Sequence, residues 1–120
     1  MAKILLADDT VDARVIYRTI FEYGGHAVIE AADGVEAVEK AREHCPDIVV
    51  MDVTMPVMDG LEAIRRLKAD VATRLIPVLV LTAHALASDR EEAAQAGADA
   101  YLDKPCAPRT VLAEVERLLR

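Results

Sequence analysis

Acidic residues follow two short apolar segments of the chain at the point where each segment ends. Asp8 and Asp9 come directly after Ile4–Ala7, and Asp52 comes directly after Ile48–Met51. Open parallel sheets bind ligands in the crevice outside the carboxyl ends of their strands, so these carboxylates are expected to share one crevice. Two carboxylates about 4 Å apart repel by roughly 4 kcal/mol at an effective dielectric of about 20. The arrangement therefore predicts a cation site.

The residue types around this crevice favour magnesium and phosphoryl chemistry. The ligands are oxygen atoms without clustered His or Cys, and Mg²⁺ commonly takes one or two carboxylates together with waters and a phosphate. Thr82 follows Val78–Leu81, and Lys104 comes two residues after Ala100–Leu102. A carboxylate can form an aspartyl phosphate when a metal and cationic donors neutralise the phosphoryl oxygens. Because a lysine ammonium and a threonine hydroxyl are suitable donors, the residues predict a phosphoaspartate site.

Short apolar segments rich in Val, Ile and Leu alternate with longer segments of helical periodicity, in about five units. This alternation predicts an α/β fold in which helices cover both faces of a parallel sheet. The expected strands span 4–7, 26–30, 48–51, 78–81 and 100–102. The expected helices begin near Asp12, Asp33, Gly60, Ser88 and Pro108. The apolar face of the first helix is expected to comprise Val15, Ile16, Ile20 and Phe21.

Capping patterns mark the starts of two expected helices and are missing from a third. Asp33 with Glu36, and Ser88 with Glu91, have the spacing of a capping box, in which the first side chain accepts a hydrogen bond from a free backbone N–H group. The last helix has Ala107 at the cap position, where Ser, Asp or Asn is usual. We therefore expect this last helix to begin less firmly than the others.

Length and composition fit one domain and exclude several classes of function. A chain of 120 residues can bury roughly two thirds of its unfolded surface, so residues 1–120 are expected to form a single domain without an output domain. The formal net charge of −7 argues against a protein that binds the nucleic-acid backbone. No signal sequence or membrane-length apolar stretch is present, so the expected location is the cytosol. Cys45 and Cys106 lack metal or redox spacing and are expected to be structural.

The sequence resembles the receiver domain of two-component response regulators, including the stand-alone chemotaxis-type members. The resemblance covers essentially the whole chain and depends on the order of five short motifs: Asp8-Asp9, Asp52 with Met55-Pro56, Asp59-Gly60, Thr82-Ala83 and Lys104-Pro105. It implies a doubly wound, flavodoxin-like fold with five parallel strands in the order 2-1-3-4-5. In that order the first and third strands are neighbours.

The resemblance also implies roles for the acids. Asp52 corresponds to the phosphoacceptor of the family. Asp9 and Asp52 correspond to direct ligands of Mg²⁺, together with the backbone carbonyl of Thr54, and Asp8 to a ligand that acts through water. Mg²⁺ is therefore the implied cofactor.

The remaining implied roles concern the phosphoryl group and its consequences. Lys104 and Thr82 correspond to the residues that hold the phosphoryl oxygens. Tyr101 matches the switch aromatic, which turns inward when the Thr82 hydroxyl moves toward the phosphoryl group. The surface of the fourth helix, fifth strand and fifth helix then changes shape. Thr54 and His84 border the phosphoryl group, and we expect His84 to modulate its lifetime.

The implied function is a phosphorylatable signalling switch and not a turnover enzyme. Its implied partners are a histidine kinase or phosphotransfer protein, which supplies the phosphoryl group, and a downstream effector protein or output domain. Specificity for the kinase is expected mainly on the first helix and in the loop after the fifth strand. No direct partner among nucleic acids or membranes is expected.

Three other functions are open to the same residues. A phosphatase of the haloacid dehalogenase kind also forms a phosphoaspartate, but its Asp-x-Asp motif would follow the first strand, where Thr10 interrupts it. A flavin binder of the same fold is disfavoured because the acids would repel the flavin phosphate and only 3% of residues are aromatic. A receiver domain that docks a partner independently of phosphate is the third alternative.

Overall fold

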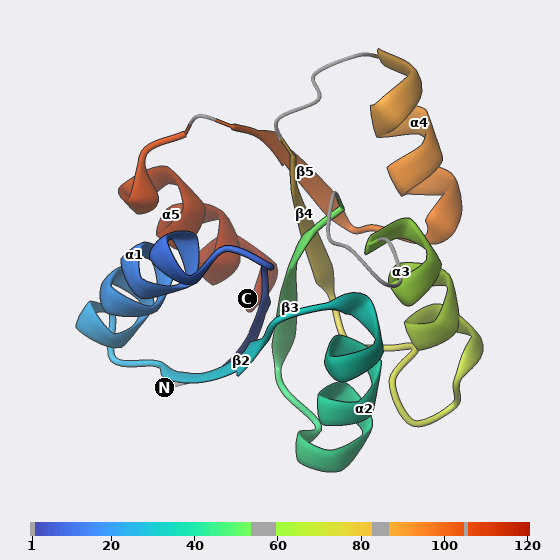
Figure 1. Ribbon diagram of the computed structural model, residues 1–120, viewed down its shortest axis with the longest axis horizontal. Helices are drawn as coiled ribbons and strands as arrows, with labels where there is room; N and C mark the ends of the chain where they lie inside the picture. Colours follow the sequence, from blue (N-terminus) through green and yellow to red (C-terminus); the bar gives the residue numbers. More distant parts are fainter. Residues whose placement is uncertain (1, 54–59, 83–86, 105) are drawn as a thin grey trace.

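One parallel β-sheet forms the centre of the molecule (Figure 1). The computed structural model describes residues 2–53, 60–82, 87–104 and 106–120. Within these residues the strands lie in the order β2-β1-β3-β4-β5, and every pair of neighbours is parallel. The strands are β1 (Lys3–Ala7), β2 (Ala27–Ala31), β3 (Ile48–Asp52), β4 (Val78–Thr82) and β5 (Ala100–Asp103). The predicted fold class and strand order are confirmed, and β2 lies one residue later in the chain than expected.

Helices cover both faces of the sheet (Figure 1). They are α1 (Val11–Tyr23), α2 (Gly34–His44), α3 (Gly60–Ala69), α4 (Ala87–Ala96) and α5 (Pro108–Leu118). The helices α1 and α5 cover one face, and α2, α3 and α4 cover the other (Figure 1). In the described part of the chain, no helix is long and apolar enough to cross a lipid bilayer.

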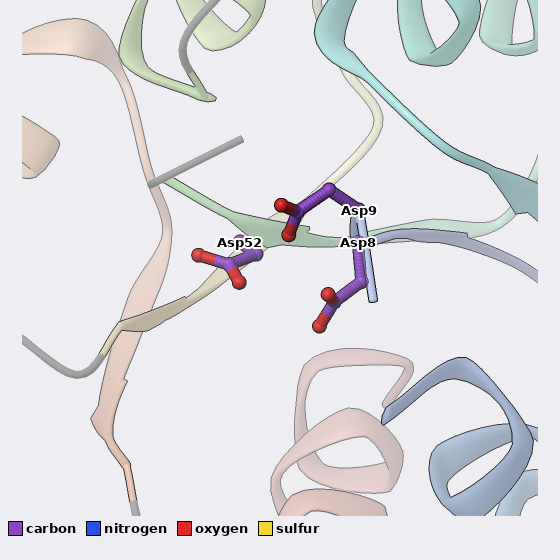
Figure 2. Close-up of side chains that lie close together, drawn as sticks. All are labelled: Asp8, Asp9 and Asp52. Atoms are coloured by element: carbon purple, nitrogen blue, oxygen red, sulfur yellow. The ribbon is translucent and has the colours of Figure 1, made fainter. Parts of the chain in front are cut away.

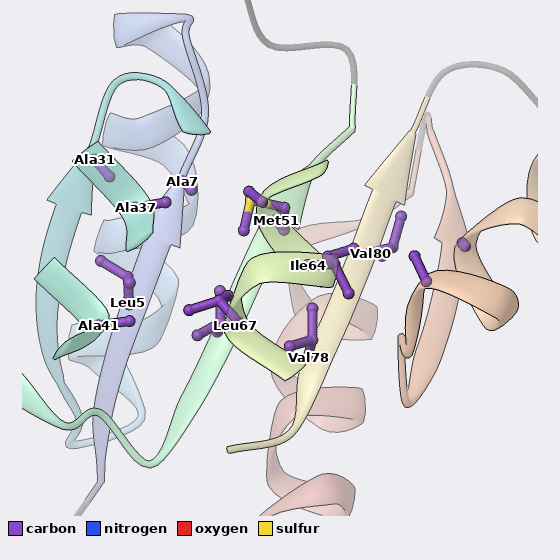
Figure 3. Packing of buried hydrophobic residues seen from close by; sticks show 14 residues of the cluster. Leu5, Ala7, Ala31, Ala37, Ala41, Met51, Ile64, Leu67, Val78 and Val80 are labelled. Carbon is purple, nitrogen blue, oxygen red and sulfur yellow. The ribbon is translucent and has the colours of Figure 1, made fainter. Parts of the chain in front are cut away.

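The central strand β3 explains why the sheet needs helices on both faces. All five of its residues are buried. Val49 and Met51 point into the cluster beneath α2, α3 and α4, which Figure 3 shows, whereas Ile48 and Val50 point into the cluster beneath α1 and α5. Burying one such side chain contributes about 1.5–3 kcal/mol, so this apolar strand is stable only between two layers.

Strand register brings distant parts of the chain to the same edge of the sheet. Ala7 in β1 pairs with Met51 in β3, so the residues that follow each of them lie at the same level. Asp52 then pairs with Leu81, the residue before the end of β4. The carboxyl ends of β1, β3 and β4 therefore meet at one edge.

The helix α1 packs with a different face from the one predicted. Phe21 is buried and Ile20 is partly buried, as expected, but Val15 and Ile16 are 57% and 52% exposed. Tyr17 is buried in their place, and its ring stacks on Phe21 at a centroid distance of 6.5 Å. The prediction for Val15 and Ile16 was wrong because α1 has apolar residues on more than one side, and only packing against the sheet selects the buried one.

The two predicted capping boxes have different outcomes. Asp33 is the N-cap of α2, and its side chain accepts a hydrogen bond from the backbone N–H of Glu36 at 2.8 Å. Glu36 does not complete the box but pairs with Lys40 one turn later. The other box was wrong, because α4 begins at Ala87 and Ser88 therefore lies inside the helix. The spacing of a capping box is a local pattern and does not by itself fix the residue at which a helix begins.

The start of α5 lacks a side-chain cap, as the sequence predicted. Ala107 is the N-cap, with an extended backbone at φ −64° and ψ 140° and no side-chain hydrogen bond. This conformation is the one that Ser or Asp adopts when it caps a helix. The Thr110 N–H donates to the Ala107 carbonyl at 2.9 Å, so the start of α5 lacks the side-chain partner that Asp33 gives to α2.

We predict that Ala107→Ser raises the free energy of unfolding by about 1 kcal/mol, because the hydroxyl can accept a hydrogen bond from the first turn of α5. Asp33→Ala is the matched control and should lower it by a similar amount, since it removes an existing cap. Urea unfolding followed by circular dichroism measures both changes. An unchanged midpoint for Ala107→Ser together with the expected loss for Asp33→Ala would contradict the prediction.

Candidate functional site

Three carboxylates meet at the carboxyl edge of the sheet (Figure 2). Asp8 and Asp9 directly follow β1, and Asp52 is the last residue of β3. One carboxylate oxygen of each lies within 4.8 Å of the others. Asp8 and Asp52 are only 1% and 6% exposed, whereas Asp9 is open to solvent. The structure thus brings together the three acids that the sequence placed at strand ends.

The two acids after β1 are held differently. Asp8 is fixed because its backbone N–H donates to the Ala31 carbonyl at 3.0 Å and its Oδ1 accepts from the Thr10 N–H at 2.9 Å. Arg14 also donates to the Asp8 carbonyl. The Asp9 carboxylate is contacted by the Thr10 hydroxyl at 3.5 Å, a long hydrogen bond on the solvent side. Asp8 is therefore a rigid wall of the site, and Asp9 is exposed and able to accept a ligand.

Lys104 joins the two buried acids. Its Nζ atom lies 3.2 Å from Asp52 Oδ2 and 3.3 Å from Asp8 Oδ2. Partial burial lowers the pKa of the Lys104 ammonium, but the charge of Asp52 and then that of Asp8 outweigh this effect, so the pKa lies above its ordinary value. Lys104 therefore stays charged throughout the physiological pH range. Its ammonium group donates to Asp52 and Asp8.

The donor set fits a divalent cation. Asp8, Asp9 and Asp52 together carry three negative charges, and the Lys104 ammonium neutralises one of them. The remaining negative charge lies in a crevice where two of the carboxylates are shielded from water. The carboxylates therefore repel one another more strongly than they would on the surface. The ligand atoms are carboxylate oxygens, which suit a hard ion such as Mg²⁺.

Close packing beside Asp52 explains a glycine that sequence reasoning noted only as part of a motif. Gly60 begins α3, and its N–H donates to the Val53 carbonyl at 3.3 Å. A Cβ atom at position 60 would lie 2.4 Å from Val53 Cα and 2.6 Å from the Asp52 carbonyl oxygen. Backbone atoms cannot yield by that much, so glycine is required where α3 packs against the end of β3. The sequence contained no sign of this approach beyond the glycine itself.

The other predicted site residues are only partly described. Thr82 ends β4, and in the ladder it pairs with Asp103. Tyr101 pairs with Val80, is half-buried, and packs against the cluster beneath α2, α3 and α4. Thr54 and His84 lie outside the described residues.

A family model and curated relatives match this chain. The model of the response regulator receiver domain matches residues 4–116. The polar-differentiation response regulator DivK of Brucella ovis is 37% identical over 102 residues, which cover 85% of this chain and 83% of that protein. The same protein of Brucella suis matches with the same values.

Solved structures also match nearly the whole chain. The chemotaxis protein CheY4 of Vibrio cholerae superimposes with a TM-score of 0.93 at 34% sequence identity, and the match covers 98% of each chain. The receiver domain of a Pseudomonas aeruginosa sensor histidine kinase, with a magnesium ion coordinated in its active site cleft, gives a TM-score of 0.91 at 34% identity. That match covers 98% of this chain and 97% of the other.

We predict that Asp52→Asn lowers the pKa of Lys104 in magnesium-free buffer, because the charge of Asp52 raises this pKa more than the charge of Asp8 does. NMR titration of the lysine Cε signals measures the shift. Since the pKa is raised on folding, the stabilisation by Lys104 is complete below the pKa of an unfolded lysine and is lost as pH rises through the folded value. Asp12→Asn, which changes an exposed acid outside this cluster, is the control. A Lys104 pKa that is the same in wild type and Asp52→Asn would refute the assignment of its cause.

Proposed function

Because this chain belongs to the receiver domain family of response regulators, we propose that it is a phosphorylatable switch of a two-component phosphorelay. In this proposal residues 1–120 act as one receiver unit in the cytosol, and Asp52 accepts the phosphoryl group. The observation that carries the proposal is the buried carboxylate of Asp52, which has the Lys104 ammonium 3.2 Å away and lies beside Asp8 and Asp9.

Asp52 is the nucleophile in this proposal. One of its carboxylate oxygens attacks the phosphorus of a phosphohistidine, the P–N bond breaks, and the imidazole leaves with the electron pair and takes up a proton. Burial of Asp52 limits the water around the nucleophile, and β3 holds its backbone in place. Lys104 then donates to a phosphoryl oxygen, and the Thr82 hydroxyl donates to another. The protein thus takes up one phosphoryl group as a signal.

Asp9 and Asp52 are the acids that would hold Mg²⁺, together with the Thr54 carbonyl that the family resemblance supplies. Asp9 suits this role because it is exposed and has a long contact with Thr10. Asp8 suits a water-mediated role, since both of its carboxylate oxygens already accept hydrogen bonds. When bound, the ion neutralises charge on the phosphoryl oxygens during transfer.

The output surface in this proposal comprises α4, β5 and α5. Tyr101 lies in the middle of β5 and packs in the layer that contains α4. By the family resemblance, the Tyr101 ring turns inward when the Thr82 hydroxyl moves toward the phosphoryl group, and the two positions of the ring would correspond to two populated states. The phosphoryl group shifts the balance only by the difference in its interaction with those states. An effector protein or output domain that binds one state then receives the signal.

The exposed apolar side of α1 suits the phosphodonor. It begins at Val11, two residues after Asp9, and continues through Val15 and Ile16. A groove of about 540 Å³ follows beside it, lined by α1 residues together with Pro108 and Arg109 at the start of α5. A helix of a histidine kinase or phosphotransfer protein that lay along this surface would end beside the acid cluster, so its histidine could reach Asp52.

We predict that a small acyl phosphate and Mg²⁺ add one phosphoryl group to the wild type, and that Asp52→Asn or chelation of the metal abolishes the addition. Intact-mass measurement detects the product directly. Asp33→Asn keeps a side-chain oxygen at the cap and changes an acid outside the site, so it is a control that should be phosphorylated normally. If the wild type gained no mass, the alternative of a docking domain that works without phosphate would replace this proposal.

We predict that Ile16→Ser slows phosphoryl transfer from a phosphorylated histidine phosphotransfer domain by about tenfold, or about 1.4 kcal/mol. The reason is lost apolar contact with the donor helix, so the rate with a small acyl phosphate should not change. Ile16 is largely exposed, and its replacement should leave stability within about 0.5 kcal/mol of the wild type. Val71→Ser removes an exposed apolar side chain elsewhere and is the control. If transfer slowed equally with both donors, Ile16 would affect the phosphoryl-transfer step itself and not the binding of the donor protein.

A further inference from the structure

The connection between α3 and β4, residues 70–77, presents two large apolar side chains to solvent. Val71 is 78% exposed and Leu75 is 88% exposed. The connection leads into the amino end of β4 and therefore lies at the opposite edge of the sheet from Asp52, beside α3 (Figure 1). Because both side chains lie outside the core, polar residues at positions 71 and 75 would not lower the free energy of unfolding through lost core packing. The function proposed above does not use either side chain.

This connection is held in one conformation by its own hydrogen bonds. The Asp70 carboxylate accepts from the Ala72 N–H at 2.9 Å, and the Asp70 carbonyl accepts from the Arg74 N–H at 2.8 Å. Thr73 is buried, and its hydroxyl donates to the Leu67 carbonyl at 2.6 Å. The exposed side chains are therefore displayed on an ordered backbone, which lowers the entropy lost when a partner binds.

A groove of about 470 Å³ lies next to Val71, between α2 and α3. Its apolar lining comes from Val38, Ala69 and Val71, and its charged lining consists of two cations, Arg42 and Arg66, and one anion, Asp70. In the part of the chain that the structure describes, Arg42 pairs with Asp70 and Arg66 pairs with Glu62, each through its Nε atom. The terminal guanidinium nitrogens of both exposed side chains can therefore still donate to a carboxylate of a partner.

The charge of this region is opposite to that of the protein. The two helices and the connection, residues 34–44 and 60–76, contain six basic and five acidic residues, whereas the whole chain has 14 basic and 21 acidic residues. A basic partner would be attracted to the rest of the molecule and repelled here. The exposed guanidinium groups of Arg42 and Arg66 line the groove, so they attract carboxylates of a partner and favour an acidic segment over a basic one.

We infer that the groove between α2 and α3, together with Val71 and Leu75, binds an acidic amphipathic segment of a partner protein. Aliphatic side chains of the segment contact Val71 and Leu75, and its carboxylates pair with Arg42 and Arg66. This recognition follows the helix-in-groove mode, in which apolar anchors supply the contact and flanking charges set the orientation. The surface lies at the other edge of the sheet, so it binds its partner whether or not Asp52 is phosphorylated.

The test is an NMR titration of the ¹⁵N-labelled protein with a short capped peptide built from pairs of Glu and Leu. We expect shifts of the backbone amides around Arg42 and in residues 66–76, and none with the corresponding peptide of Lys and Leu. Leu75→Ser and Arg66→Glu should each weaken binding by roughly tenfold, through loss of an apolar contact and through charge reversal respectively. Leu75 is exposed, so Leu75→Ser should unfold at the wild-type midpoint, whereas Arg66→Glu loses its pair with Glu62 and should unfold at a slightly lower denaturant concentration.

Several outcomes overturn the inference. They are no shift at millimolar peptide, equal shifts with the Glu and Lys peptides, or shifts that map to α1 or to the acid cluster. Asp52→Asn separates this surface from the proposed phosphorylation site, because the variant should bind the Glu peptide as the wild type does. Loss of binding in Asp52→Asn would contradict the independence of the two sites, whereas failed phosphorylation of the wild type would leave this inference unaffected.

Discussion

The mutual repulsion of three carboxylates at one edge of the sheet is the constraint on which the site depends. Asp8 and Asp52 cannot move apart, because Ile4–Ala7 of β1 pairs with Ile48–Met51 of β3 and these residues are buried. Asp9 follows directly in the chain and adds a third charge. The Lys104 ammonium relieves part of this repulsion, and the cation of the proposed function would relieve the remainder.

The rest of the fold keeps this arrangement in place. Apolar side chains pack against both faces of the sheet. The start of α3 approaches the end of β3 so closely that only glycine fits at position 60. The side chain of Lys104 reaches back from the end of β5 to the ends of β1 and β3. Because the core is closely packed, the proposed switch would transmit a change at this edge through discrete shifts of packed groups, of which Tyr101 is the one proposed here.

Some local expectations were overruled by packing. Helical periodicity in α1 was correct, and Phe21 is buried as expected, but Tyr17 is buried where Val15 and Ile16 were expected. The capping pattern at Ser88 was misleading, since the helix begins at Ala87. The same kind of pattern was correct at Asp33, where the side chain accepts the expected hydrogen bond. Local spacing identifies residues that could be buried or could cap a helix, and tertiary contacts determine which of them do so.

The sequence by itself determined the α/β class and the strand-end positions of Asp8, Asp9, Asp52, Thr82 and Lys104, because alternating periodicities and strand termini are local properties. Its resemblance to a known family supplied the strand order. Only the tertiary structure decided the separation of the three acids, the bridge that Lys104 forms between two of them, and the exposure of Val71 and Leu75. These features depend on register and on packing between residues far apart in the chain, which no local pattern encodes.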